Sequence, residues 1–306
     1  MHETRRLVAS EAVLSKEVQQ ALARWNKERL APGSPGDGPS SEYDLEMREA
    51  EGNFVDALRE EIAPLAAAAP LDPLAFVRWY EDLRQSGPGQ NDLLFPWLAT
   101  QASKSELRWF FEQEAAGEAG FDDLVAMTQV KLPAQAKLEL ARNYWDEMGR
   151  GNGKGMHGPM LSAVADALDV TPTIEGTIPE SLALANAMTA MATRRDYAWH
   201  SVGALGAIEL TAPTRAGKVA AGIRRVGLNG RLRHYFDLHS VLDVKHSAAW
   251  VKEVITPLVA EDPRRARWIG EGALMRLRCG ERCYARYREH LWAPPVMRVK
   301  AAVRSV

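Results

Sequence analysis

Three side chains that commonly bind metals, His239, Asp243 and His246, are spaced to share one face of a helix. On an α-helix, positions i, i+4 and i+7 fall within an arc of roughly 60°. Unpaired polar groups are costly in an apolar interior, so this face can be buried only if a cation satisfies it. The Asp243-x-x-His246 spacing also matches the carboxylate-x-x-His spacing of iron sites in helical bundles. The stripe therefore predicts a helix that either faces a metal or lies open to solvent.

Helical patterns extend over almost the whole chain. Apolar residues recur at three- and four-residue spacing, whereas period-two runs of β-branched residues are nearly absent. The pattern begins again at Asp72-Pro73, and Ser103-x-x-Glu106 forms a second helix-starting signal. The other ranges with helical patterns are 11–30, 42–66, 121–128, 133–148, 157–169, 179–195, 197–225 and 263–292. We therefore expect an all-α fold.

The N-terminal third differs from the rest because a Pro/Gly/Ser-rich segment, residues 31–41, interrupts it. A second break follows at Ser86–Gly89. We expect residues 1–90 to form a helical extension that is packed on, or loosely tethered to, a main domain of residues 91–306.

Charge and composition exclude several classes of protein. The net charge of −2 and the pI near 6.4 disfavour a general nucleic-acid binder, which needs a basic surface. No run of about 18 apolar residues is present to span a membrane, and the first residues lack the apolar core of a signal peptide. The two cysteines, Cys279 and Cys283, fit a helix face better than a disulfide framework. We expect a cytoplasmic protein without nucleic-acid or membrane partners.

Four glycines alternate over residues 149–155, between Glu147 and His157. Each glycine disfavours a helix by about 1 kcal/mol relative to alanine. A phosphate-binding loop is one interpretation, but no strand precedes the segment and its spacing matches neither common phosphate-loop pattern. The preferred hypothesis is that the helix breaks within 149–156, so that Glu147 and His157 approach a common centre.

Glu209 lies in a helical stretch rich in small residues and is either solvent-facing or held by a partner. With it, the candidate ligands are three carboxylates and three imidazoles from three helical segments. Such a mixture suits iron or manganese better than structural zinc, which favours cysteine. The number of candidate ligands predicts a dinuclear centre formed by Glu147, His157, Glu209, His239, Asp243 and His246.

The order of these residues resembles that of the haem-oxygenase-like diiron oxidases and oxygenases, also described as iron-containing redox enzymes. The resemblance rests on Asp146-Glu147-x-Gly-x-Gly, then His157, Glu209 and the His239-x3-Asp243-x2-His246 stripe, and covers roughly residues 95–292. It implies a seven-helix bundle of the haem-oxygenase type without haem. It further implies that the six residues above bind two irons, with Glu147 and His157 on the first core helix.

Members of this family that oxygenate nitrogen carry one more carboxylate on an earlier helix. Glu114 and Glu118 are the candidates in this sequence, and we prefer Glu114 because it lies within the helical run. Glu118 lies between two glycines at the end of that run and is the substitute. The resemblance thus favours N-oxygenation by a ligand set that includes Glu114.

The resemblance implies an enzyme with two Fe(II) ions that activates O2 to oxidise a small organic substrate. We expect N-oxygenation of an amine or amino acid in specialised metabolism. The alternative is C–H oxidation with desaturation or C–C cleavage of an amino acid or fatty acid. The family also implies a homodimer and leaves room for an external electron donor, such as a reductase.

Three other classes make different demands on the sequence. A metal-free hydrolase of the related thiaminase-like bundle needs a cysteine near the pocket, but Cys279 and Cys283 fall in the last helix. A haem-degrading enzyme needs one proximal histidine and not six ligand-type residues. A metal-free helical interaction protein would show no dependence on iron.

Several other polar residues have weaker expected roles. His200 is expected to contact a ligand residue or to lie at the surface, and His234 should face away from the stripe because it is about 140° from His239. Tyr235 either lines the pocket or belongs to the core. The basic segment 224–233 is a solvated face or, alternatively, a site for a substrate carboxylate.

Overall fold

The structure is a computed structural model that describes residues 12–292 except 35, 37, 118, 119 and 229. Every regular element among these residues is helical, which confirms the predicted all-α fold. The elements are α2 (Lys16–Leu30), α3 (Ser41–Ala66), α4 (Pro73–Ser86), α5 (Leu94–Thr100), α6 (Lys104–Gly117), α7 (Phe121–Thr128), α8 (Ala134–Glu147), η1 (Gly149–Gly151), η2 (Gly153–Gly155), α9 (His157–Leu168), α10 (Pro179–Thr193), η3 (Arg195–Tyr197), α11 (Ala198–Arg225), α12 (Gly230–Ala249), η4 (Trp250–Ile255), α13 (Thr256–Glu261) and α14 (Arg265–Leu291).

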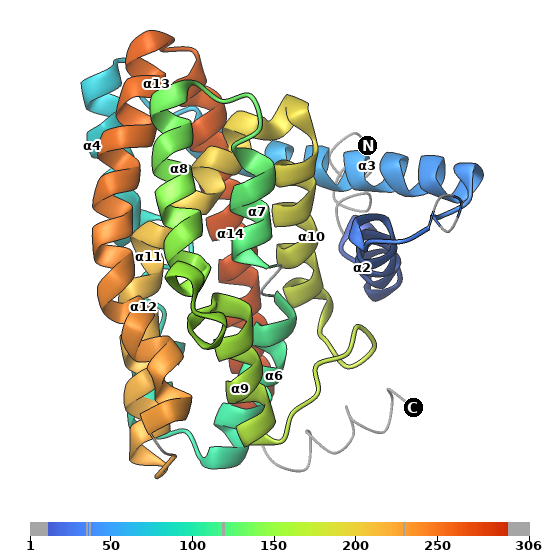
Figure 1. Ribbon diagram of the computed structural model, residues 1–306, viewed down its shortest axis with the longest axis vertical. Helices are drawn as coiled ribbons and strands as arrows, with labels where there is room; N and C mark the ends of the chain where they lie inside the picture. The colour runs from blue at the N-terminus through green and yellow to red at the C-terminus, as the bar shows by residue number, and fades with distance from the viewer. Residues whose placement is uncertain (1–11, 35, 37, 118–119, 229, 293–306) are drawn as a thin grey trace.

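The long helix α11 lies at the centre of the bundle and packs against α5, α12 and α14. Helices α8, α11, α12 and α14 run roughly along the long axis of the molecule (Figure 1). Where α11 crosses α14, a side chain on Gly203 would overlap the Ile269 carbonyl, and one on Gly272 would overlap that of His200. The absence of a side chain at Gly203 and at Gly272 therefore allows the two helices to pack closely.

The N-terminal helices α2, α3 and α4 cover one part of this bundle. Helix α2 packs on α10, α3 on α14, and α4 on α11 and α13. Trp25, Phe54 and Phe76 are fully buried and belong to the same hydrophobic cluster as the central helices. The division at residue 90 stays a prediction, but α2–α4 share their core with the bundle.

Local signals account for several helix starts. The Ser103 N–H donates to the Glu106 carboxylate, and the Glu106 N–H donates to the Ser103 hydroxyl, which confirms the capping box. Asp72 caps α4, whose first residue is Pro73. The π-helix η4, directly after the His239–His246 stripe, has no comparable signal and was not predicted.

Two further features of the described helices bear on function. None of these helices combines the length and apolar character needed to cross a membrane. Cys279 and Cys283 are free and buried in α14, as the sequence indicated. Burial raises the pKa of the Cys279 thiol to about 11, so this thiol is not an activated nucleophile.

Candidate metal centre

The glycine segment separates two helices that each contribute one ligand-type side chain. Helix α8 ends at Glu147 and α9 begins at His157, with the turns η1 and η2 between them. Gly149, Arg150 and Gly151 have φ values of 60°, 53° and 85°, in the left-handed region that favours glycine. The predicted helix break is confirmed, and the two residues lie on separate helices instead of the single core helix that was expected.

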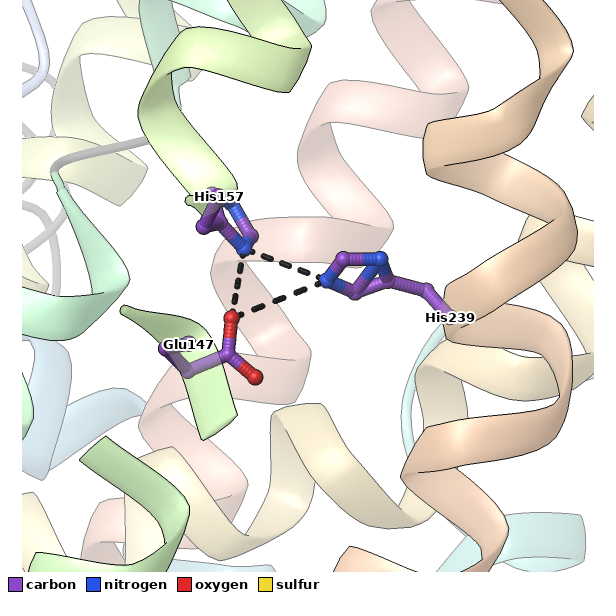
Figure 2. A group of neighbouring side chains, drawn as sticks. All are labelled: Glu147, His157 and His239. Atoms are coloured by element: carbon purple, nitrogen blue, oxygen red, sulfur yellow. Dashed lines mark hydrogen bonds and ion pairs between the residues drawn. The ribbon is translucent and has the colours of Figure 1, made fainter. Parts of the chain in front are cut away.

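Glu147, His157 and His239 form the first group of ligand-type atoms (Figure 2). His157 Nδ1 lies 2.9 Å from Glu147 Oε2 and 3.1 Å from His239 Nε2. His239 Nε2 lies 3.7 Å from the same carboxylate oxygen. All three side chains are buried, so the loop and the α12 stripe bring one carboxylate and two imidazoles together away from solvent.

Glu147, Glu209 and His246 form a second group on the other side of the Glu147 carboxylate. His246 Nδ1 lies 3.7 Å from Glu147 Oε1 and 3.5 Å from Glu209 Oε1. Glu209 projects from α11 and is buried, which excludes the solvent-facing alternative. Each oxygen of Glu147 therefore faces a different group of ligand-type atoms.

Contacts on the outer side of each imidazole orient its inner nitrogen. His239 Nδ1 donates to the Tyr235 carbonyl at 2.9 Å, and His157 Nε2 lies 3.0 Å from the Tyr235 hydroxyl. His246 Nε2 lies 3.1 Å from Asp146 Oδ2. Such outer contacts select the tautomer that leaves the inner nitrogen free to bind a metal. Sequence reasoning assigned no role to Asp146, although it directly precedes Glu147 in the motif.

Asp243 lies on the stripe but belongs to neither group. It is buried, and burial together with the charges of Glu209 and Glu147 raises its pKa to about 9. Burial lowers the pKa of His246, but the Glu209 and Asp146 carboxylates outweigh this and raise it to about 9. Carboxylates crowded in this way retain protons unless a cation neutralises them.

The donor set fits a pair of iron or manganese ions. Asp243 Oδ1 and His246 Nδ1 are buried and have no hydrogen-bond partner within the part of the chain that the structure describes. Buried polar atoms without partners are costly, and a cation would satisfy both. The ligand-type atoms of both groups are oxygen and nitrogen, which suits iron or manganese better than structural zinc. The assignment of the six residues as iron ligands stays a prediction.

Glu114 lines the same cavity as the two groups but is not a member of either. It accepts a hydrogen bond of 2.9 Å from the Tyr287 hydroxyl of α14. Glu118 lies outside the described residues. The choice between these carboxylates as a further ligand stays a prediction.

The other polar residues that the sequence singled out, among them His234, His200 and Arg225, lie in different surroundings. His234 is exposed, as its helical phase predicted. The expectation for His200 was wrong, because it is buried and pairs with Glu271 of α14 at 3.0 Å, where no candidate ligand contacts it. In the basic segment, Arg225 bonds to the carbonyls of Ala99 and Ala102, so it holds a loop and does not reach the centre.

A cavity of about 120 Å³ adjoins the centre and is lined mainly by apolar and aromatic side chains. Tyr235 lines the cavity and also belongs to a buried hydrophobic cluster, so both interpretations of that residue apply. Arg215 of α11 and Arg276 of α14 also line it. Neither arginine was singled out from the sequence, because no local pattern distinguishes a pocket arginine from a surface one.

Comparisons with known proteins show the family and the fold of this chain. The sequence profile of a family described as iron-containing redox enzymes matches residues 108–281, which is more than half of the 306-residue chain. No curated protein matches the chain. A solved structure of a CADD-like protein of unknown function from Nostoc punctiforme PCC 73102 is similar, with a TM-score of 0.52 and 15% identity. The alignment covers 79% of this chain and 99% of the other, and at that identity it shows the fold alone.

Proposed function

Because the chain belongs to the family of iron-containing redox enzymes, we propose that it is an O2-dependent oxidoreductase with two Fe(II) ions in the buried centre. The observation that carries this proposal is the position of Glu147. Its two oxygens face two separate groups of ligand-type atoms, one with two imidazoles and one with a carboxylate and an imidazole. This arrangement provides for two cations that share one carboxylate.

The protein residues have distinct tasks in this proposal. When bound, two ferrous ions supply electrons for the reduction of O2. The first group would hold one ion and the second group the other, with Asp243 available from the α12 stripe. Asp146 and Tyr235 hold the imidazoles in the orientation that presents a lone pair inward. The apolar walls of the cavity exclude water from the reacting atoms.

We propose N-oxygenation of an amine or amino acid as the reaction, in a specialised biosynthetic pathway. Support comes from Glu114, since an additional carboxylate on an earlier helix lines the cavity beside the centre. The alternative by the same centre is C–H oxidation with desaturation or C–C cleavage of an amino acid or fatty acid. Electrons would come from the substrate or from an external reductase. We further propose that the protein forms a homodimer. We place it in the cytoplasm, where free cysteines such as Cys279 and Cys283 persist.

Other classes fit the site less well. A cysteine hydrolase would need a thiol at the cavity, and neither Cys279 nor Cys283 lines it. A haem-degrading enzyme would need one proximal histidine, whereas three imidazoles converge here with carboxylates. A metal-free interaction protein gives no reason to bury so many ionisable groups in one place.

Anaerobic titration with Fe(II), followed by mixing with O2 in a stopped-flow spectrophotometer, tests the proposal. We expect two Fe(II) per chain and an optical change that depends on both iron and O2. Glu147→Gln should lose both ions, because both groups share Glu147. Glu139→Gln is the matched control, since Glu139 is also a buried carboxylate of α8 but bonds to Arg142. An end point of one ion per chain, or zinc uptake without iron uptake, would contradict the dinuclear proposal.

A further inference from the structure

Two kinds of polar side chain line the cavity beside the metal centre. The candidate ligands are one kind, and the guanidinium groups of Arg215 and Arg276 are the other. Glu209 and Arg215 both belong to α11 and lie six residues apart, which separates them by roughly 9 Å along the helix. Arg276 belongs to α14, which contributes no candidate ligand. The side chains that complete the lining are mostly apolar, so the cavity suits a molecule that joins two polar groups through an apolar part.

Arg276 is half-buried and lines this cavity, yet it makes no hydrogen bond or ion pair with any residue that the structure describes. A partly buried guanidinium group without an acceptor is available to a ligand, and a carboxylate is the acceptor that such a group binds most strongly. Gly280, one turn further along α14, makes room for it. A β-carbon on Gly280 would lie only 2.8 Å from Arg276 Nη1 and 3.3 Å from the Tyr284 hydroxyl.

Two further hydrogen-bond donors, the Arg215 guanidinium and the Tyr284 hydroxyl, line the cavity together with Arg276. The Arg215 guanidinium lies 5.7 Å from the ring of Tyr284 and 5.9 Å from that of Phe95, in reach of a cation–π contact. Burial raises the pKa of Tyr284, so its hydroxyl stays protonated and can donate, although the charges of both arginines oppose this rise. Glu114, the candidate additional ligand, lines the same cavity and accepts a hydrogen bond from the Tyr287 hydroxyl. Two guanidinium groups and the Tyr284 hydroxyl therefore line the cavity as donors.

We propose that Arg276, together with Arg215, binds the carboxylate of the substrate, with the Tyr284 hydroxyl as a third donor. The substrate is then an organic acid that is oxidised at an atom other than its carboxylate carbon, because the backbones of Glu209 and Arg215 lie roughly 9 Å apart along α11. Arginine suits this task because its planar group donates two parallel hydrogen bonds to a carboxylate. The assignment of this acid as a substrate rests on the proposed function, whereas the binding of the carboxylate does not.

Calorimetric titration of the full-length, metal-free protein with octanoate and with octanamide tests this assignment. The two probes have the same chain length and differ in charge, and without iron no carboxylate–metal bond can form. We expect octanoate to bind and octanamide to bind at least tenfold more weakly. Arg276→Gln should weaken octanoate binding roughly tenfold to hundredfold, as the loss of a charge-assisted hydrogen bond predicts. Arg276→Lys should restore part of the loss, since it keeps the charge but not the planar group.

Arg286→Gln is the matched control, because Arg286 also lies on α14 but pairs with Glu289 in an exposed position. It should bind octanoate as the parent does. Gly280→Ala should also weaken octanoate binding, because its methyl group would displace Arg276. Equal binding of the two probes, or parent-like octanoate affinity in a folded Arg276→Gln variant, would overturn the proposal. Circular dichroism melts establish that each variant is folded.

Iron titration of the same variants separates this inference from the proposed function. We expect Arg276→Gln to take up two Fe(II) ions, as the parent does, because Arg276 belongs to neither group of ligand-type side chains. A parent that binds octanoate through Arg276 but takes up no iron would disprove the proposed function and retain the carboxylate site. If the parent protein takes up iron and reacts with O2 but binds octanoate and octanamide equally, the carboxylate site is disproved and the proposed function is retained.

Discussion

Gly149 has the most demanding position in the loop that connects Glu147 to His157. Its φ is 60°, and a β-carbon there would lie 2.5 Å from the carbonyl carbon of Gly155 and 2.8 Å from the Met156 nitrogen. Both neighbours are backbone atoms, so no side-chain rotation can relieve the overlap. Gly149→Ala should therefore open the loop and move the Glu147 carboxylate away from the His157 imidazole.

The size of the effect follows from the geometry. A left-handed backbone costs a non-glycine residue roughly 1–2 kcal/mol, and the overlap with the Gly155 backbone adds to this. Since each 1.4 kcal/mol changes an equilibrium constant about tenfold, a strain of about 2 kcal/mol corresponds to Fe(II) binding that is about 30-fold weaker. The loop lies at the surface, so it can open without unfolding the bundle. Gly149→Ala should therefore weaken Fe(II) binding about 30-fold. The melting temperature of the metal-free protein should change little.

Gly153→Ala is the matched control in the same loop. Gly153 does not have a positive φ, and a β-carbon there would meet no atom within 4 Å. This variant should bind iron as the parent does and should gain up to about 1 kcal/mol of stability, because the unfolded chain loses entropy. Anaerobic Fe(II) titrations and thermal melts of both variants make the measurement. Parent-like iron affinity in Gly149→Ala would refute the role given to this loop.

Three further predictions concern single side chains. His246→Ala should reduce iron uptake from two ions per chain towards one, whereas His234→Ala should leave it unchanged because His234 is exposed; metal analysis of the purified variants decides this. Asp146→Asn should weaken iron binding about tenfold, since it alters the contact that orients His246, and parent-like Fe(II) affinity would exclude that role. Burial would raise the pKa of Glu271, but hydrogen bonds from His200 and Arg267 and nearby positive charge hold it at about 2, below its ordinary value of 4.5. Glu271 therefore stabilises the fold above pH 4.5 and loses this effect as the pH falls towards 2. The difference in free energy of unfolding between the parent and Glu271→Gln, measured in urea, should shrink between pH 6 and pH 3, and a constant difference would contradict the assignment.

The sequence by itself determined the helices and the candidate ligand set. Helical periodicity and N-terminal caps depend on residues a few positions apart, so Ser103-x-x-Glu106 and the phase of the His239–His246 stripe could be interpreted without a structure. The glycine segment also predicted its own helix break. It did not distinguish Gly149 from Gly153, because only the folded loop shows which glycine has a left-handed backbone and a close neighbour.

The tertiary structure decided which groups meet across helices. That Glu147 faces two groups, that His200 pairs with Glu271, and that Arg276 lines the cavity each depend on how helices cross and how far apart they pack. His200 and Glu271 are 71 residues apart, so no pattern of local spacing links them. Helix formation is governed by interactions within a few turns, whereas the site is assembled by packing between segments that are distant in the chain. For that reason the candidate ligands could be proposed from the sequence, whereas the grouping of their side chains and their outer contacts could not.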